Sequence, residues 1–272
     1  MKRSVFFVSD STGITAETFG HALLSQFDAL EYAQSTIPFV ADAHQAREAV
    51  QRIDAAGAED GHRPIVFSTL TDPLLNEILR KSQALIVDFF SAFIRPLEIE
   101  LNRGSSHAAG RFHGLVDPAS YDGRIDAMDY ALDHDDGGGV GHYRDADVIL
   151  VGVSRSGKTP TCVYLALQFG IRAANYPITE DDLDDDGLPE LLVPHKERLF
   201  GLTIVAERLR RIRSERRPNS RYASLNRCRR EVADTEAMFN REGIPFIDTS
   251  GSSIEEIASK ILQQTRLTRR SF

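Results

Sequence analysis

A glycine-rich stretch in the second half of the chain has the residue types and the spacing of a phosphate-binding loop. It consists of Gly152, Val153, Ser154, Arg155, Ser156, Gly157, Lys158 and Thr159. The two glycines let the backbone curl, so that successive N–H groups can point at phosphate oxygens. Lys158 can bridge the terminal phosphates of a nucleotide, and the Thr159 hydroxyl can hold Mg²⁺. The pattern predicts nucleotide binding and phosphoryl transfer.

Such a loop must be positioned by a strand before it and a helix after it. An apolar run at 148–153 precedes the loop, and a helix-like segment follows it to about residue 169. Pro160 falls in the first helical turn, where a missing N–H is tolerated. The competing interpretation is a glycine-rich turn with an accidental Lys-Thr pair, and the surrounding pattern counts against it.

The remaining elements alternate between short apolar runs and helical patterns. In the first part of the chain, strand-like runs occur at 5–8, 35–40, 64–68 and 84–88, and helical patterns occur at 14–27, 43–55, 72–81 and 91–101. Beyond the loop, strands are predicted at 172–176, 199–205 and 243–248, and helices at 207–217, 222–239 and 253–263. This alternation predicts an α/β protein. We expect an N-terminal α/β domain with a mostly parallel sheet and a C-terminal P-loop kinase-like α/β domain.

A glycine cluster at 137–141 marks the predicted division, with domains at 1–140 and 141–272. Residues 102–123, rich in Gly, Ser, His and Pro, are expected to form a long loop. The loop carries His107 and His113. A phosphate-handling loop and a plain surface loop are both open interpretations.

The overall composition restricts the function classes. The chain has 272 residues and a formal net charge of −8, so its overall charge does not indicate nucleic acid binding. Its two cysteines, Cys162 and Cys228, lie far apart, which favours a reducing compartment and argues against a zinc site or a disulfide framework. No apolar run approaches the length of a membrane span, and the N-terminal apolar stretch is too short for a signal peptide. We expect a cytoplasmic protein that binds neither membrane nor nucleic acid.

Three aspartates are candidate catalytic residues. Asp10 begins the polar loop 10–13 between a strand and a helix, where an anion could bind, although ordinary helix capping is the competing interpretation. Asp135 and Asp136 follow His134 directly. One of them could take a proton from a hydroxyl nucleophile or help to bind Mg²⁺. A solvated helix end is the alternative for this pair.

Two further aspartates and an arginine-rich stretch have less specific signals. Asp88 and Asp248 each end an apolar run, as the metal-binding aspartate of a P-loop enzyme does. An aspartate at the end of a strand is, however, more often an ordinary turn residue. The arginines are Arg208, Arg210, Arg211, Arg213, Arg216, Arg217 and Arg221. One or two could reach the phosphates or dock an acidic protein, while most are expected to be solvated.

Several of these segments together resemble one known family. The resemblance rests on 9–17, on 134–137, on the loop with Pro160, on 169–177 and on 199–204. They are similar to the pyruvate phosphate dikinase / phosphoenolpyruvate synthase regulatory protein family, nearly from end to end. Residues 219–225 and the long 102–123 loop favour the phosphoenolpyruvate synthase branch.

The resemblance implies a bifunctional serine/threonine kinase and phosphorylase. The kinase reaction would move the β-phosphate of ADP to a threonine of phosphoenolpyruvate synthase, release AMP and switch that enzyme off. The reverse regulation would use inorganic phosphate and produce pyrophosphate. By resemblance, residues 152–159 form the ADP-binding loop, while no catalytic base is assigned; relatives can have Cys at the position of Ser156. The behaviour of relatives is compatible with a homodimer.

Other functions remain open from the residues alone. The same activity could act on pyruvate phosphate dikinase. The loop and the turn that follows Asp248 are also compatible with a small-molecule kinase of the nucleoside or shikimate type. A nucleotide-sensing module without catalysis is the alternative from a different class.

Overall fold

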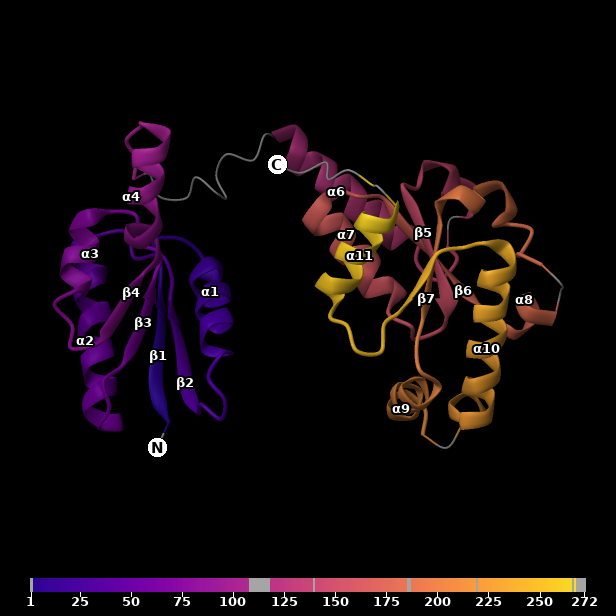
Figure 1. Cartoon of the computed structure of the whole chain (residues 1–272), viewed down its shortest axis with the longest axis horizontal. Coiled ribbons are helices and arrows are strands. Elements are labelled where there is room, and N and C mark those ends of the chain that lie inside the picture. Colours follow the sequence, from indigo (N-terminus) through magenta and orange to yellow (C-terminus); the bar gives the residue numbers. More distant parts are fainter. Residues whose placement is uncertain are drawn as a thin grey trace. The chain divides into compact units, whose positions relative to one another are not determined.

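The chain forms two compact α/β units, which divide between Leu115 and Val116 (Figure 1). The computed structural model describes residues 2–107, 118–138, 140–184, 187–218, 220–265 and 267. Each unit contains one four-stranded sheet in which all strands run parallel. This confirms the predicted fold class.

The first unit has a sheet in the order β2-β1-β3-β4. Its elements are β1 (Arg3–Val8), α1 (Ile14–Leu24), β2 (Tyr32–Ile37), α2 (Ala43–Asp60), β3 (Ile65–Ser68), α3 (Pro73–Leu79), β4 (Leu85–Asp88) and α4 (Phe89–Leu101). Side chains alternate between the two faces of a strand, so both faces of β1 are buried under helices. Phe6 and Val8 pack in the cluster that contains residues of α2 and α3. Val5 and Phe7 pack in the cluster that contains residues of α1 and α4.

The second unit has a sheet in the order β6-β5-β7-β8. Its strands are β5 (Val148–Val153), β6 (Ala173–Ile178), β7 (Leu199–Thr203) and β8 (Phe246–Asp248). Its α-helices are α6 (Pro118–Asp133), α7 (Lys158–Phe169), α8 (Glu180–Asp184), α9 (Ala206–Arg216), α10 (Leu225–Glu242) and α11 (Ile254–Thr265). Among its described residues, three segments form 3₁₀ helices, at Val140–Asp145, Val193–Arg198 and Arg221–Ala223. Helices α6, α7 and α11 contribute to one core cluster, and α10 contributes to another on the opposite face of the sheet (Figure 1).

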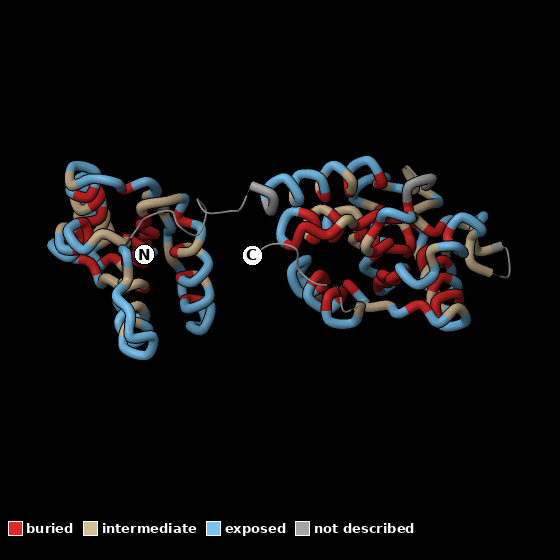
Figure 2. Tube along the Cα trace, turned by 90° about the horizontal axis from the view of Figure 1, so that it is seen from above, coloured by how far each residue is buried: buried red, intermediate tan, exposed pale blue. Residues whose placement is uncertain are grey.

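Burial follows this layering in each unit. Buried residues line the strands and the inner faces of the helices, while the outer helix faces are exposed (Figure 2). All six residues of β5 are buried, as expected for a central strand of a parallel sheet. Within the described residues, no helix is long and apolar enough to cross a membrane.

The division between the units lies earlier in the chain than the boundary predicted between residues 140 and 141. Residues 118–123, predicted as the end of a loop, instead begin α6, and this helix belongs to the second unit. Ala127 and Ala131 lie one turn apart on α6 and pack in a core cluster with Leu165 of α7. Gly137 and Gly138 of the glycine cluster therefore follow this helix within the second unit. Of the predicted long loop, residues 108–117, including His113, lie outside the described residues.

Candidate active site

The predicted order of strand, loop and helix is confirmed around residues 152–159. Strand β5 ends at Val153 and α7 begins at Lys158. Gly152 has a φ of 154°, and a Cβ at this position would lie 2.2 Å from the carbonyl oxygen of Leu202 in the neighbouring strand β7. Gly157 has a φ of 94° and precedes the first helical residue. Glycine is required at 152 by close packing and is favoured at 157 by backbone conformation.

Lys158 is folded over the loop. Only 4% of the residue is exposed, and its ammonium donates hydrogen bonds to the carbonyl oxygens of Gly152, at 2.9 Å, and Val153, at 3.0 Å. Burial lowers the pKa of Lys158 from 10.5 to about 8, and the nearby negative charge of Asp136 opposes part of that shift. A buried ammonium at this place would meet phosphate oxygens that approach the loop.

Asp135 is brought to the first turn of α7. The Thr159 hydroxyl donates a hydrogen bond of 2.7 Å to Asp135 Oδ1. The same oxygen accepts a hydrogen bond of 2.5 Å from Asn175 Nδ2. Two residues that were singled out separately in the sequence, Asp135 and Thr159, are thus direct neighbours beside the loop.

Asn175 of β6 holds the whole segment that carries the two aspartates. It is fully buried. Its backbone N–H donates to the His134 carbonyl, its side-chain oxygen accepts from the Asp136 N–H, and its carbonyl accepts from the Gly137 N–H, each at 3.1 Å. Asn175 is not among the site residues predicted from the sequence. The available signal was an amide side chain inside an otherwise apolar run, which is unusual for a buried strand unless its polar groups are bonded.

Asp136 differs from Asp135 in its surroundings. Its backbone is left-handed, with a φ of 48°. Within the described part of the chain, no hydrogen bond or ion pair engages the Asp136 carboxylate, whereas that of Asp135 is bonded twice. Among the nearby groups, Asp136 also makes the largest electrostatic contribution to stabilising the charged form of Lys158. Asp136 is therefore the aspartate whose carboxylate is available to a ligand at the loop.

His134 supports the segment from inside the unit. It is 7% exposed, its ring stacks on Tyr130 with centroids 3.9 Å apart, and its Nδ1 lies 2.7 Å from the Tyr130 carbonyl oxygen. The imidazole is thus a packed residue next to the aspartates.

Asp10 lies in the first unit. Its carboxylate accepts hydrogen bonds from the backbone N–H of Thr71, at 2.7 Å, and from the Thr71 hydroxyl, at 2.6 Å. These bonds join the loops that follow β1 and β3. The helix that comes next, α1, has Gly13 at its N-cap and no side-chain cap, so helix capping does not explain the polar residues of this loop.

The remaining sequence candidates have local structural roles. Asp88 accepts a hydrogen bond of 3.0 Å from Ser91 N at the start of α4 and forms an ion pair of 3.1 Å with Arg80. Asp248 accepts a hydrogen bond of 2.8 Å from Ser250 N in the turn after β8. Both are the strand-ending residues that the alternative interpretation expected.

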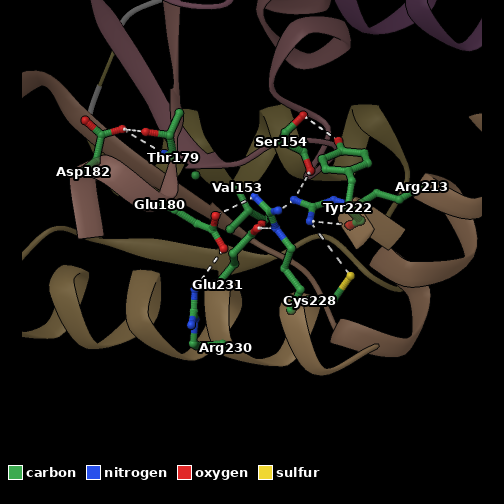
Figure 3. A network of polar contacts seen from close by, with 12 residues as sticks. Val153, Ser154, Thr179, Glu180, Asp182, Arg213, Tyr222, Cys228, Arg230 and Glu231 are labelled. Carbon is green, nitrogen blue, oxygen red and sulfur yellow. Dashed lines mark hydrogen bonds and ion pairs between the residues drawn. The ribbon is translucent and has the colours of Figure 1, made fainter. Parts of the chain in front are cut away.

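One arginine of the basic stretch turns into the interior. Arg213 of α9 is 1% exposed, whereas Arg208, Arg210, Arg211, Arg216, Arg217 and Arg221 are exposed. Its guanidinium donates to the Ser154 carbonyl of the loop at 3.2 Å, forms an ion pair of 2.7 Å with Glu231 of α10 and lies 4.2 Å from the Tyr222 ring centroid (Figure 3). Arg213 is not distinguished from its neighbours among the residues predicted from the sequence.

Comparison with known proteins identifies the family. The family model described as kinase/pyrophosphorylase matches residues 5–262, which include parts of both units. The chain belongs to this family.

Individual relatives match over nearly the whole chain. A protein of Halorhodospira halophila is 60% identical over 269 residues, which are 98% of either chain. A protein of Alkalilimnicola ehrlichii is 56% identical over 271 residues, which are 100% of this chain and 98% of the relative. A protein of Legionella pneumophila is 53% identical over 270 residues, 99% of this chain and 100% of the relative. Each of the three bears the name "Putative phosphoenolpyruvate synthase regulatory protein".

Proposed function

We propose that this protein is a bifunctional protein kinase and phosphorylase that regulates phosphoenolpyruvate synthase. ADP donates its β-phosphate to a threonine of the target, which inactivates the target, and inorganic phosphate removes the phosphoryl group as pyrophosphate. The observation that carries the chemistry is the group of Lys158, Thr159, Asp135 and Asp136 around the glycine-rich loop. The family match supports the pair of reactions, and the names of the relatives support the target.

The loop would bind the phosphates of ADP. Backbone N–H groups at 154–157 and the N-terminus of α7 favour an anion. Lys158 would leave the Gly152 and Val153 carbonyls and place its charge on the phosphates.

The residues present also fit Mg²⁺. Thr159 Oγ1 and Asp135 Oδ1 lie 2.7 Å apart, and both are oxygen donors of the kind that Mg²⁺ prefers when it also binds phosphate. When bound, the ion would neutralise charge on the phosphates. Asn175 would hold Asp135 in place for this role.

Asp136 is our candidate for the catalytic base. In the kinase direction, the threonine oxygen attacks the β-phosphorus, the bond from that phosphorus to the bridging oxygen breaks, and AMP leaves. Asp136 takes the hydroxyl proton. In the phosphorylase direction, inorganic phosphate attacks the phosphothreonine phosphorus, the bond to the threonine oxygen breaks and pyrophosphate forms. Asp136 takes the proton of the attacking hydrogen phosphate and delivers it to the threonine oxygen as that oxygen leaves.

Transfer of label from ADP labelled at the β-phosphate to purified phosphoenolpyruvate synthase tests the proposal. The assay is run with and without phosphoenolpyruvate, because the family resemblance implies that the target is modified preferentially when its own catalytic histidine is phosphorylated. We expect label on threonine and release of AMP with the wild-type protein, and loss of transfer in Lys158→Ala. Binding of ADP without transfer would contradict the proposal and favour a sensor. Transfer from ATP to small hydroxyl compounds would instead favour a small-molecule kinase.

Matched aspartate variants separate the proposed roles. Asp136→Asn should lower kcat by about 10²–10⁴-fold and change ADP binding much less, because it removes the base together with one negative charge near Lys158. Asp135→Asn should change the Mg²⁺ dependence of transfer. Asp234→Asn, an exposed position on α10, is the control and should behave as wild type. Equal transfer by Asp136→Asn and wild type would refute the assignment of the base.

The Pi-dependent reaction either shares this site or uses the loop that begins at Asp10. Asp10→Asn and Lys158→Ala should be compared in both directions. Loss of both reactions in Lys158→Ala, with both retained in Asp10→Asn, supports one shared site. Selective loss of the phosphorylase in Asp10→Asn would support two sites.

A further inference from the structure

A buried polar network joins Ser154 of the glycine-rich loop to helices α9 and α10 (Figure 3). Arg213 Nη2 donates to the Ser154 carbonyl oxygen at 3.2 Å and to Glu231 Oε2 at 2.7 Å. Arg213 Nη1 donates to the Tyr222 carbonyl oxygen at 3.2 Å. The side chains of Arg213 and Glu231 are 1% and 8% exposed, so these contacts are shielded from water and salt.

Tyr222 makes a second contact with the same loop residue. Its hydroxyl donates a hydrogen bond of 3.0 Å to Ser154 Oγ, and its ring covers the Arg213 guanidinium at 4.2 Å. Ser154 is therefore held twice, by its carbonyl and by its hydroxyl. The next residue, Arg155, has a φ of 79°, an unusual conformation for a residue with a side chain.

The network continues outward through carboxylates that are each shared by two cations. Glu231 also pairs with Arg227 at 2.6 Å. Arg227 and Arg230 both pair with Glu180, at 2.9 Å each. Glu180 begins α8, just after β6, the strand that carries Asn175. The chain of contacts thus links α8, α9 and α10 to the loop.

We propose that Arg213 and Tyr222 are positioning residues of the nucleotide loop. They hold Ser154 and the strained Arg155 in one conformation, so that the N–H groups of the loop face the phosphates before ADP arrives. Ordering of the loop would otherwise oppose binding. This inference deepens the proposed function and rests on it for the identity of the nucleotide.

Replacing Arg213 alone would mix two effects, because it also removes one of the two cationic partners of the buried Glu231 carboxylate. The decisive variant is therefore Arg213→Met together with Glu231→Met, which replaces both buried charges by apolar side chains of similar size and leaves Arg227 paired with Glu180. Two readouts are measured on the free, full-length protein. The first is hydrogen exchange of backbone amides in a peptide that covers residues 152–158. The second is the dissociation constant for ADP.

We expect faster amide exchange in the loop and about tenfold weaker ADP binding, even though stability to urea stays close to that of wild type. Tyr222→Phe, which keeps the ring over Arg213 and removes only the bond to Ser154, should weaken ADP binding by a smaller factor. Arg211→Met, an exposed neighbour on α9, is the matched control and should change neither readout. Unchanged exchange and unchanged ADP affinity in the double variant would overturn the proposal.

The two readouts separate failure of this inference from failure of the proposed function. If wild-type protein does not bind ADP, the proposed function fails, while amide exchange still tests whether Arg213 and Tyr222 order the loop. Normal exchange in the double variant then overturns the inference independently of any nucleotide.

Discussion

Lys158 is expected to destabilise the nucleotide-free protein at neutral pH. Its side chain is buried, and its pKa is lowered from 10.5 to about 8 because burial disfavours the charged form. Below about pH 8, Lys158 carries its proton in both the folded and the unfolded state. The folded state therefore bears the full free-energy cost of burying the charged ammonium. Between these two pKa values the unfolded state binds more protons than the folded state. Stability contributed by this residue must therefore rise with pH in that window.

Lys158→Met removes the titrating group and keeps most of the apolar stem. A pKa of about 8 instead of 10.5 corresponds to a penalty of about 3 kcal/mol in full. About 2 kcal/mol of it should disappear for the wild type between about pH 7 and pH 9.5. Lys158→Met has no titrating group at this position, so its free energy of unfolding lacks this pH-dependent contribution. The difference in the free energy of unfolding, variant minus wild type, should accordingly fall by about 2 kcal/mol over this range.

Urea unfolding of the two proteins at both pH values, without nucleotide and with a chelator, measures this difference. Taking the change between two pH values cancels the hydrogen bonds and packing that the substitution also removes. Lys81→Met, at an exposed lysine, is the matched control and should show no such change. An equal difference for Lys158→Met at both pH values would refute the conclusion that the buried lysine is charged at a cost in stability.

Three further predictions concern the parts around this lysine. Gly152→Ala should abolish ADP binding because its methyl group would lie 2.2 Å from the Leu202 carbonyl oxygen. Gly157→Ala, whose added carbon would meet no described atom within 4 Å beyond its chain neighbours, should cost only about 1–2 kcal/mol of stability for its φ of 94°, measured by urea unfolding. Equal effects of the two alanines on binding would contradict this reasoning. Asn175→Ala should lower kcat of phosphoryl transfer by about tenfold or more because Asp135 loses its buried donor, and the exposed Asn240→Ala is the control. Normal kcat in Asn175→Ala would show that Asp135 needs no such support. A fragment of residues 116–272 should fold and bind ADP, whereas 141–272 should melt without cooperativity because it lacks α6; cooperative melting of the shorter fragment, followed by circular dichroism, would exclude this role for the helix.

Sequence alone could predict the features that depend on local spacing. The glycine-rich loop and its flanking strand and helix follow from residues within one segment, and the structure has this order. The alternation of apolar runs and helical patterns likewise predicted an N-terminal α/β domain with a mostly parallel sheet and a C-terminal α/β domain, and both sheets are parallel. Local patterns were sufficient because each element buries a face that its own sequence defines.

Features that depend on pairing over long distances could not be predicted. Asn175 reaches Asp135 because β6 pairs with β5 in one particular register, which places Asn175 beside Leu150. That register is a property of the folded sheet. The choice of Arg213 from seven arginines depends on the rotational phase of α9, which also buries Leu209 one turn earlier. In retrospect this spacing of four residues was a usable signal.

The domain boundary shows the same limit. Glycines at 137–141 resemble a linker, yet Gly137 donates its N–H to Asn175 in the second unit. Two alanines one turn apart on α6 were weak evidence for a buried face, because alanine is common on every face of a helix.

The most direct test of the central claim follows one phosphorus atom through both reactions. Phosphoenolpyruvate synthase is labelled with ADP carrying the label at its β-phosphate, and a parallel sample receives ADP labelled at the α-phosphate. After removal of nucleotide, inorganic phosphate is added together with the protein. We predict label on the target from the β position alone and its release as labelled pyrophosphate. Label from the α position, or release as free phosphate, would contradict the proposed function.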